Sequence, residues 1–375
     1  MSSPLPAAQA GVRSRRRSAR RGTLGPGVAV TGAASGAGLL LTRHLLDRAD
    51  IGRVVAIDAS RGDAAGATWR LADVTDPAIA RRLAGVDVLV HLATDLSLGA
   101  DTAAAAQRSA RNIRAAQAVL TAAAAAGVRR VVVVTSAMVY GALADNPVPL
   151  AEDAPLRAVP DRSVVGDLLE IEAVAARARE VHPGLSVTVV RPVTVVGAGI
   201  DSVLTRHFES PRLLVVRGAR PRWQFCHVDD LVSALAAIVV GDLDGPLTVA
   251  SGGWLEQEEV EAAAGLGRVE LPAGVAFGTA ERLHRLGMVP APASELAYAV
   301  YPWVVDSARL RAAGWRPAYD GTAALERLLS DVVGHHTLAA RRLGRTDATI
   351  GAAGATVAVL GTAALVRRAR RRRGR

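Results

Sequence analysis

The sequence predicts an α/β protein with a doubly wound parallel sheet, and three observations support this fold class. From about residue 26, short apolar runs rich in valine alternate with helical stretches. The runs are continuous rather than alternating in polarity, which is typical of strands that helices bury on both faces. A glycine-rich turn follows directly on the first run, as it does at a strand-to-helix junction in such sheets.

Each element follows from its local composition. Valine- and isoleucine-rich runs bounded by glycine, proline or aspartate predict strands, and longer alanine-, leucine- and arginine-rich stretches predict helices. The expected strands cover 28–31, 54–58, 86–92, 131–135 and 186–191, with one more just before Asp73. The expected helices cover 38–48, 103–126 and 163–179.

The glycine turn predicts a bound dinucleotide. Glycines at a strand-to-helix junction let the backbone approach a phosphate, and the opening helix directs its free N–H groups and positive dipole end at the anion. The residues expected to line the pyrophosphate are Thr31, Gly32, Ser35, Gly36, Ala37 and Gly38. The spacing alone is a weak signal in a chain with 36 glycines, and the strand and helix on either side give it weight.

Two aspartates are candidates for the adenosine half of the cofactor. Asp58 ends the second strand, 20 residues after Gly38, where a carboxylate binds both ribose hydroxyls and favours NAD over NADP. Arg61 lies three residues further on and would pair with a 2′-phosphate, which keeps NADP as the alternative. Asp73 and Val74, after the third strand, are expected at the adenine edge. For both aspartates the competing interpretation is an ordinary turn or helix-capping residue.

Charge and cysteine content exclude several classes of protein. All 45 basic residues are arginine, so no mechanism that needs a lysine ammonium is open to this chain. Thirteen of the arginines lie in 1–22 and 367–375, which hold no acid, so the remainder carries a net charge of −3. An acidic body argues against nucleic-acid binding. A single cysteine, Cys226, excludes a disulfide framework, is expected to be a buried apolar residue and fits a cytoplasmic location. No metal-binding cluster is visible.

Pattern and composition divide the chain into six segments. After Pro192 the regular alternation ends, and glycine, proline and tryptophan cluster, so we expect a smaller lobe over the carboxyl edge of the sheet. The predicted segments are a basic flexible arm (1–25), a dinucleotide-binding domain (26–190), a region that is mainly a substrate lobe (191–333), a linker (334–347), an uncharged segment (348–366) and a basic tail (367–375).

Six ordered motifs resemble a known family. They lie at 86–93, at Asn112 with the helix that leads to 126–128, and at 131–141, 191–197, 225–231 and 313–317. Over about 26–333 the chain resembles the extended short-chain dehydrogenases/reductases, in the branch of NAD-dependent epimerases and dehydratases. The resemblance implies a Rossmann sheet, a nucleotide sugar or other small-molecule substrate, and a homodimer formed through sheet-flanking helices. It also implies cofactor contacts at Leu92, Ala93, Thr135 and Pro192. The turn departs from the family, since its Gly-x-x-x-Gly-x-Gly spacing is more similar to the short single-domain branch.

The resemblance also shows what this chain lacks. The family uses a serine, a tyrosine that moves the proton, and a lysine four residues after the tyrosine on the same helix face. Ser136 matches the serine that orients the substrate. Alignment of Glu170 and Glu172 with an acidic pair common in the family puts Val164 at the tyrosine position and Leu168 at the lysine position. No tyrosine lies between Tyr140 and Tyr298, so the usual pair is missing in any register.

Other polar residues are weak substitutes. Asp161, Arg162, Ser163 and Asp167 flank the start of the same helix. Asp167 would act as a base only if it faced the nicotinamide, and an aspartate in a first helical turn more often complements the helix dipole. The resemblance implies that His91 packs under the cofactor. It also implies that His227 and Asp229 belong to a motif that joins the two lobes.

The C-terminal segment admits three interpretations. Residues 348–366 carry no charge and would measure about 28 Å as a helix, close to the ~30 Å hydrocarbon core, but they are mostly alanine and glycine. Seven arginines follow, and a spanning helix on a cytoplasmic domain would export them against the positive-inside tendency. The alternatives are association with the cytoplasmic surface of an anionic membrane and a solvated tail.

The residues support three functional hypotheses. The first is a NAD(P)-binding protein of this family that lacks the usual pair and acts as a sensor, a scaffold or an enzyme with altered chemistry. The second is a working NAD(P)-dependent epimerase, dehydratase or reductase with a substitute proton relay. The third, a membrane-tethered structural partner with a vestigial pocket, is disfavoured because the glycine turn and Asp58 are present.

Overall fold

The computed structural model describes residues 25–97, 102–241, 243–286, 289, 291–332, 337–338 and 341–342. The uncharged segment at 348–366 and the basic tail at 367–375 lie outside the described residues, as do almost all of the N-terminal arm and most of the expected linker. Among the residues that are described, no helix has both the length and the apolar character needed to cross a membrane.

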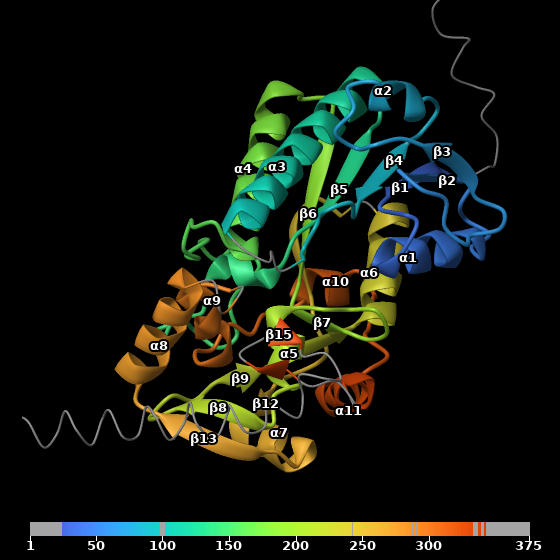
Figure 1. Cartoon of the computed structure of the whole chain (residues 1–375). Coiled ribbons are helices and arrows are strands. Elements are labelled where there is room, and N and C mark those ends of the chain that lie inside the picture. Colours follow the sequence, from blue (N-terminus) through green and yellow to red (C-terminus); the bar gives the residue numbers. More distant parts are fainter. Residues whose placement is uncertain are drawn as a thin grey trace, which may run out of the picture.

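A seven-stranded, wholly parallel sheet forms the centre of the molecule (Figure 1). Strand β1 lies in the middle, β2 and β3 extend to one side, and the later strands extend to the other. The order in which strands are added to the sheet therefore changes direction at the boundary between β1 and β4, although all strands remain parallel. In spatial order the strands are β11 (Gly245–Val249), β6 (Ser186–Pro192), β5 (Arg130–Val134), β4 (Val88–His91), β1 (Gly27–Thr31), β2 (Arg53–Asp58) and β3 (Thr68–Leu71).

The strand register brings the predicted site residues to one edge. Thr31, the last residue of β1, pairs with Ile57 of β2 on one side and with His91 of β4 on the other. Parallel strands end at the same edge of a sheet, so the glycine turn lies beside the segments that follow Asp58 and His91.

Helices cover both faces of the sheet and bury its valines. One face packs against α1 (Gly36–Leu46) and α6 (Val228–Val240), and the other against α2 (Ile79–Arg82), α3 (Thr102–Ala125) and α4 (Val164–Val181). Figure 1 shows the pair α3 and α4 on one side and the pair α1 and α6 on the other. This arrangement explains why the strand sequences are continuously apolar, because each strand has a layer of helices above and below it.

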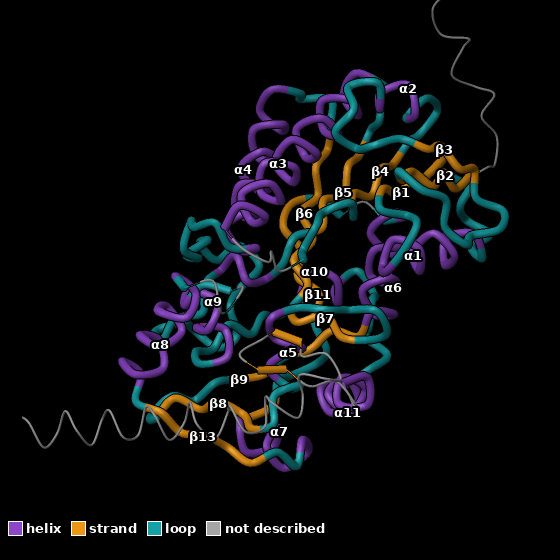
Figure 2. The backbone as a smooth tube through the Cα atoms, viewed as in Figure 1, coloured by secondary structure: helices purple, strands orange, loops and turns teal. Residues whose placement is uncertain are grey.

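A second lobe lies beyond the carboxyl edge of the sheet (Figure 2). It is built from small two-stranded pairings and short helices. Its strands are β7 (Thr194–Val196) with β10 (Phe225–His227), β8 (Arg212–Val216) with β13 (Gly267–Leu271), and β9 (Arg222–Trp223) with β12 (Leu255–Glu256). Its helices are α5 (Val203–His207), α7 (Gln257–Ala264), α8 (Ala273–Arg285), α9 (Ala293–Leu296), the 3-10 turn η2 (Ala297–Ala299), α10 (Ala308–Ala312) and α11 (Gly321–Val332). A separate pair joins β14 (Thr337–Leu338) to β15 (Arg341–Arg342).

The expected fold class is confirmed. Each expected strand and helix of the first 190 residues is present within about two residues of its expected ends. The proposed division at residue 190 stays a prediction, but the segment after it contributes to both parts of the molecule. Strand β11 pairs in parallel with β6 and α6 covers the sheet, so the chain returns to the first domain after it has entered the second.

Candidate functional site

The glycine turn adopts a conformation that requires its glycines. Gly32 and Gly36 have φ angles of 72° and 52°, in the left-handed region that side chains with a Cβ disfavour. A Cβ on Gly38 would lie 2.0 Å from the carbonyl oxygen of Gly32, so helix α1 can pack this closely on the turn only with glycine there. A Cβ on Gly32 would lie 3.0 Å from the backbone N of Ala93, so the turn also packs closely on the segment after β4.

The first turn of α1 is arranged to receive an anion. Ser35 is the N-cap residue, yet its side chain makes no capping hydrogen bond. Nothing lies within 4 Å of a Cβ built on Gly36, so that glycine faces open space. An eleven-residue helix with an uncapped, exposed N-terminus presents free N–H groups and the positive end of its dipole. These residues fit the pyrophosphate of a dinucleotide.

Asp58 lies against the glycine turn, as the sequence predicts. Its Oδ2 accepts a hydrogen bond of 3.1 Å from the backbone N of Ala34, and its Oδ1 accepts one of 3.4 Å from the backbone N of Ser60. The carboxylate therefore borders the turn on the β2 side. Arg61 is exposed on the same loop.

Asp73 and Val74 have structural roles in addition to any role at the adenine. The Asp73 carboxylate accepts hydrogen bonds from the backbone N and the hydroxyl of Thr75, both at 2.8 Å, and forms a half-exposed ion pair with Arg111 of α3 at 3.1 Å. The Thr75 hydrogen bonds, with a smaller effect of Arg111, lower the pKa of Asp73. The side chain of Val74 is buried in the core beneath α2 and α3.

His91 and Thr31 form a buried pair under the turn. The Thr31 hydroxyl oxygen lies 2.8 Å from His91 Nδ1 and accepts a hydrogen bond of 3.3 Å from the backbone N of Leu92. Burial lowers the pKa of His91 to about 4, so its ring is neutral at pH 7. Its Nε2 is buried with no hydrogen-bond partner among the described residues. Leu92 and Ala93 are half-buried at this edge.

Thr135, Glu172 and Arg191 form a buried network that joins two of the family-like motifs to α4. The Thr135 hydroxyl donates to Glu172 Oε1 at 2.8 Å, and Arg191 forms a two-pronged ion pair with the same carboxylate at 2.9 and 2.5 Å. Arg191 also donates to the hydroxyl of Tyr140 at 2.8 Å. All four residues are buried. The network supports the alignment of Glu172 with a family acid.

Ser136 lies at the end of β5, where its hydroxyl is only partly buried. It donates to the carbonyl of Pro192 at 3.3 Å and accepts from the backbone N of Met138 at 3.2 Å, which caps the 3-10 turn η1 (Ala137–Tyr140). Ser136 and Pro192 are thus brought together at the carboxyl edge, beside α4. The position agrees with the expected site, and the serine role stays a prediction.

Helix α4 carries apolar side chains at the two positions that the sequence alignment predicts for the family's tyrosine and lysine. Leu168 lies one turn before Glu172 and is 2% exposed, in the same core cluster as the strands β4 and β5. Val164, a further turn back, is half-buried and packs against this cluster, as does Ala93. Neither residue can donate a proton or carry a charge, so this face of the helix continues the core up to the edge of the site.

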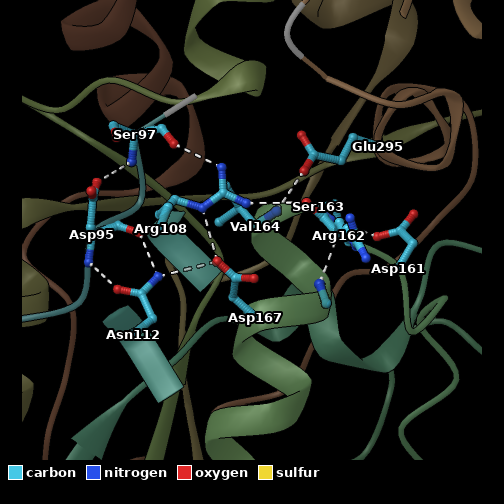
Figure 3. Close-up of polar contacts among 11 residues, drawn as sticks. Asp95, Ser97, Arg108, Asn112, Asp161, Arg162, Ser163, Val164, Asp167 and Glu295 are labelled. Atoms are coloured by element: carbon cyan, nitrogen blue, oxygen red, sulfur yellow. Dashed lines mark hydrogen bonds and ion pairs between the residues drawn. The ribbon is translucent and has the colours of Figure 1, made fainter. Parts of the chain in front are cut away.

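A charged cluster surrounds the first turn of α4 (Figure 3). Arg108 of α3 donates from Nε to Asp167 Oδ2 at 2.9 Å, and both side chains are almost fully buried, at 6% and 1% exposure. Arg108 also donates to the carbonyls of Ser97 and Arg162, so it ties two loops to the helix. Asn112 donates to the same Asp167 oxygen at 3.2 Å. Asp167 lies in the first turn of α4, as expected of an acid that complements the helix dipole, and is also the buried partner of Arg108.

Glu295 reaches this cluster from the second lobe. Its Oε1 accepts a hydrogen bond of 3.1 Å from the backbone N of Val164, the first residue of α4. Burial, with the nearby charges of Asp161 and Asp167, raises the pKa of Glu295 to about 7, although Arg108 opposes this shift. The carboxyl group also borders a cavity of about 90 Å³ between α4 and α9. A carboxyl group that titrates near neutrality is chemically suited to proton transfer.

Sequence reasoning missed Arg108 and Glu295. An arginine in an alanine-rich helix and a glutamate in a proline-rich segment carry no local signal. Their burial depends on contacts with residues that lie 59 and 131 positions away in the chain.

Other expected candidates have structural partners. His227 is the N-cap of α6 and stacks on Tyr319 with the ring centres 3.9 Å apart, and its Nδ1 accepts from the backbone N of Asp229 at 3.3 Å. Cys226 is buried, and burial raises the pKa of its thiol. Within the described part of the chain, no group of histidine, cysteine or acidic side chains is arranged to hold a metal ion.

Comparison with known proteins places the chain in a family. Residues 28–245, more than half of the chain, match the NAD dependent epimerase/dehydratase family. The chain belongs to this family. An uncharacterised protein of Mycobacterium tuberculosis is 28% identical over 309 residues, which cover 80% of this chain and 82% of that protein. An uncharacterised protein of Sinorhizobium fredii is 27% identical over 56% of this chain and 52% of its own length.

Solved structures share the fold at low sequence identity. A dTDP-glucose 4,6-dehydratase of Streptomyces venezuelae with NAD bound has a TM-score of 0.60 and is 22% identical, covering 81% of this chain and 96% of its own. MoeE5 in complex with UDP-glucuronic acid and NAD has a TM-score of 0.61 at 23% identity, covering 82% and 98%. The UDP-glucose 4-epimerase of Thermus thermophilus, with NAD, has a TM-score of 0.61 at 19% identity, covering 82% and 99%. The predicted Rossmann fold and family are confirmed, and NAD agrees with the family's dependence.

Proposed function

We propose that the protein binds NAD across the glycine turn and Asp58, and that it lacks the proton relay usual in its family. It is then either non-catalytic, as a cofactor-dependent sensor or scaffold, or an enzyme of altered chemistry. When bound, NAD would supply a hydride acceptor. The chain's own residues would hold the cofactor: the N-terminus of α1 would bind the pyrophosphate, and Asp58 would bind the hydroxyls of the adenosine ribose. Ser136 would orient an oxygen of the substrate.

One observation carries this proposal. Glu172 is fixed by its hydrogen bonds to Thr135 and Arg191, and those two residues belong to separate family-like motifs. With Glu172 fixed, the register of α4 is fixed, and the positions one and two turns earlier are Leu168 and Val164. Both are apolar and pack against the core. Under the proposed alignment these are the positions of the family's tyrosine and lysine, and no tyrosine or lysine lies near either of them in the sequence.

A second candidate function rests on Glu295. The protein would then be an active sugar-nucleotide epimerase, dehydratase or reductase, in which this carboxyl group replaces the tyrosine as the proton carrier. The position of Glu295, whose carboxylate accepts a hydrogen bond from the backbone N of Val164 at the start of α4, favours it, as does the raised pKa of about 7. The nucleotide-sugar ligand of MoeE5 makes nucleotide sugars the first substrates to test.

Calorimetry followed by turnover assays separates these functions. We expect NAD to bind more tightly than NADP, because a carboxylate at Asp58 repels a 2′-phosphate. Conversion of a panel of nucleotide sugars is then followed by product analysis as well as by reduced-nicotinamide absorbance, because epimerases and dehydratases return the hydride and leave no net reduced cofactor. Binding without turnover supports the non-catalytic function. Turnover that Ser136→Ala abolishes would contradict it, and turnover that Glu295→Gln also abolishes would support the second function. A chain that binds neither dinucleotide would contradict both.

A gain-of-function variant tests the alignment itself. Val164→Tyr with Leu168→Lys restores the family pair at the proposed positions. Because Leu168 is 2% exposed, the lysine costs stability, and we expect a lower melting temperature for the double variant than for Val164→Tyr alone. Activity that appears only in the double variant would support the register of α4.

We also propose a location and an assembly, on sequence grounds alone. The protein would be cytoplasmic and form a homodimer, and residues 348–366 with the following arginines would bind an anionic membrane surface. Co-sedimentation with vesicles of phosphatidylglycerol and phosphatidylcholine, compared with phosphatidylcholine alone, tests the membrane contact. Analytical ultracentrifugation tests the dimer.

A further inference from the structure

Two buried polar atoms near the start of α4 have no partner that would explain their burial. Asp167 is 1% exposed, and a single oxygen, Oδ2, receives the hydrogen bonds from both Arg108 and Asn112. Its other oxygen, Oδ1, has no hydrogen-bond partner among the described residues, and neither has the buried hydroxyl oxygen of Thr94. Burial of a polar atom without a partner is unfavourable, so each such atom is a candidate for a hydrogen bond to a ligand or water.

Asn112 connects Asp167 to the residue that follows Thr94. Its side-chain amide forms a two-way pair with the backbone of Asp95, accepting from the N and donating to the O, both at 2.9 Å. The same amide donates to Asp167 Oδ2. Figure 3 shows Asn112 between Asp95 and Asp167. Thr94 immediately precedes Asp95 in the chain, and the arrangement joins the buried Asn112 of α3 and Asp167 of α4 to the more exposed segment after β4.

Their place on the sheet suggests what the ligand is. The glycine turn follows β1, Asp58 follows β2 on one side, and Thr94 follows β4 on the other side, at the point where the chain reverses direction across the sheet. A dinucleotide whose adenosine half lies at Asp58 and whose pyrophosphate lies on α1 must extend its second half past the end of β4. The close approach of Gly32 to Ala93 brings the turn against this segment.

The charge of the cluster favours a neutral ligand. Arg108 neutralises Asp167, so the pair offers a hydrogen-bond acceptor without a net charge to attract a cation. Asp167 Oδ1 only accepts, whereas the Thr94 hydroxyl both donates and accepts. Vicinal sugar hydroxyls supply the complementary donors and acceptors.

Building on the proposed cofactor site, we propose that Asp167 and Thr94 bind the hydroxyls of the ribose next to the nicotinamide. In this chain a carboxylate, positioned by Arg108 and Asn112, would take over the ribose contact that the resemblance assigns to the missing lysine. The two residues are binding groups for the cofactor, and Arg108 and Asn112 are positioning residues. The contact would order the nicotinamide half without a tyrosine or a lysine.

Binding of cofactor fragments to the full chain tests this. NAD and ADP-ribose both carry the second ribose, and ADP does not. Asp167→Asn should weaken NAD and ADP-ribose on the order of 10-fold, because one charge-assisted hydrogen bond is lost, and should leave ADP within about twofold. Thr94→Val should weaken the same two ligands several-fold. Asp161→Asn is the matched control, because that carboxylate lies at the same helix end but is bonded to Ser163 and Ser294.

The outcomes distinguish this inference from the cofactor proposal. If Asp167→Asn weakens all three ligands alike, or Asp161→Asn has the same effect, the role is a general structural one and the inference is wrong. If wild type binds NAD and both variants bind it equally well, the unpartnered atoms are satisfied by water only, and the inference is again wrong while the cofactor proposal stands. A wild type that binds none of the three ligands overturns both. Thermal unfolding of each variant confirms that the protein tested is folded.

Discussion

At the scale of single residues, Glu295 is the group whose charge is most sensitive to pH near neutrality. It is buried between lobes, beside two other carboxylates, and burial raises its pKa from the ordinary 4.5 to about 7. Its folded pKa is therefore above its unfolded one, and the folded state binds the extra proton. The stability that this proton provides is complete below about pH 4.5 and is lost as the pH rises through about 7. The shift corresponds to about 3 kcal/mol.

We expect Glu295→Gln to remove this pH dependence while keeping the hydrogen bond to Val164. The melting temperature of the variant minus that of wild type should increase as the pH rises from 5 to 8, because only wild type loses stability over this range. Burial also lowers the pKa of His91 and of His207 to about 4, and these groups act with the opposite sign below pH 6.5, but they are present in both proteins and cancel in the difference. An exposed glutamate, Glu258→Gln, serves as control. A constant difference across this range would contradict the assignment.

Two glycines of the turn should respond differently to alanine. Gly38→Ala puts a Cβ 2.0 Å from a carbonyl oxygen, so we expect a loss of at least ~2 kcal/mol in unfolding free energy. Gly36→Ala meets no atom within 4 Å and costs only the ~1–2 kcal/mol of a left-handed residue, but its methyl group enters the expected pyrophosphate site. Thermal unfolding and NAD calorimetry check both. Normal NAD binding by Gly36→Ala would contradict the placement of the cofactor.

At the scale of elements, α4 is the helix that decides the chemistry of this protein. One side of it is anchored to the sheet by the buried carboxylate of Glu172, and its first turn is enclosed by Arg108 and Glu295. The alignment that located the missing pair required only the local spacing of acids before His182. The anchoring network could not be deduced from spacing, since it depends on β6, the segment after β5, the 3-10 turn η1 and α4, which meet only in the fold.

Removal of the Glu172 charge should destabilise the whole domain. Glu172→Gln leaves the Arg191 guanidinium buried without a counter-charge, which costs about 3 kcal/mol and lowers the melting temperature by roughly 5–10 °C. Glu170→Gln, two residues earlier and exposed, should change it by less than about 1 °C. Equal effects of the two substitutions, measured by calorimetry, would show that the network contributes nothing.

At the scale of the whole molecule, the two lobes are joined by buried carboxylates rather than by apolar contacts alone. Asp230 of α6 accepts hydrogen bonds from the backbone N of Ala318 at 2.7 Å and of Tyr319 at 3.1 Å. Glu152 likewise accepts from the backbone N of Thr248 at 3.0 Å and of Arg309 at 3.1 Å. The Asp230 bonds hold the segment between α10 and α11 against α6, and the Glu152 bonds hold the start of α10 beside β11.

We expect Asp230→Ala to release that segment. Two backbone N–H groups lose their acceptor, at about 1–3 kcal/mol each, and cleavage by chymotrypsin after Tyr319 should become faster. Asp229→Ala is the adjacent control, because its side chain is 60% exposed. An unchanged digestion pattern in limited proteolysis would contradict this role of Asp230.

The sequence predicted the first domain well because its signals are local. Val131 to Val134 can only be a buried strand, and a glycine turn between a strand and a helix has few structural alternatives. The later strand β11 lacked such a signal, since Gly245 and Pro246 begin it and its partner β6 lies more than 50 residues earlier. The charged cluster at α4 could not be predicted for the same reason, because the burial and ion pairing of Arg108 and Glu295 depend on residues that are distant in the sequence.

The lysine-free composition has a consequence at the buried pair of Arg108 and Asp167. A guanidinium keeps its charge across the whole pH range in which proteins stay folded, whereas an ammonium and a phenol both lose protons at alkaline pH. The same planar group donates to Asp167 and to the carbonyls of Ser97 and Arg162 at once, which the compact ammonium of a lysine on its flexible stem is not shaped to do. The pair therefore holds its neighbouring loops by geometry as well as by charge.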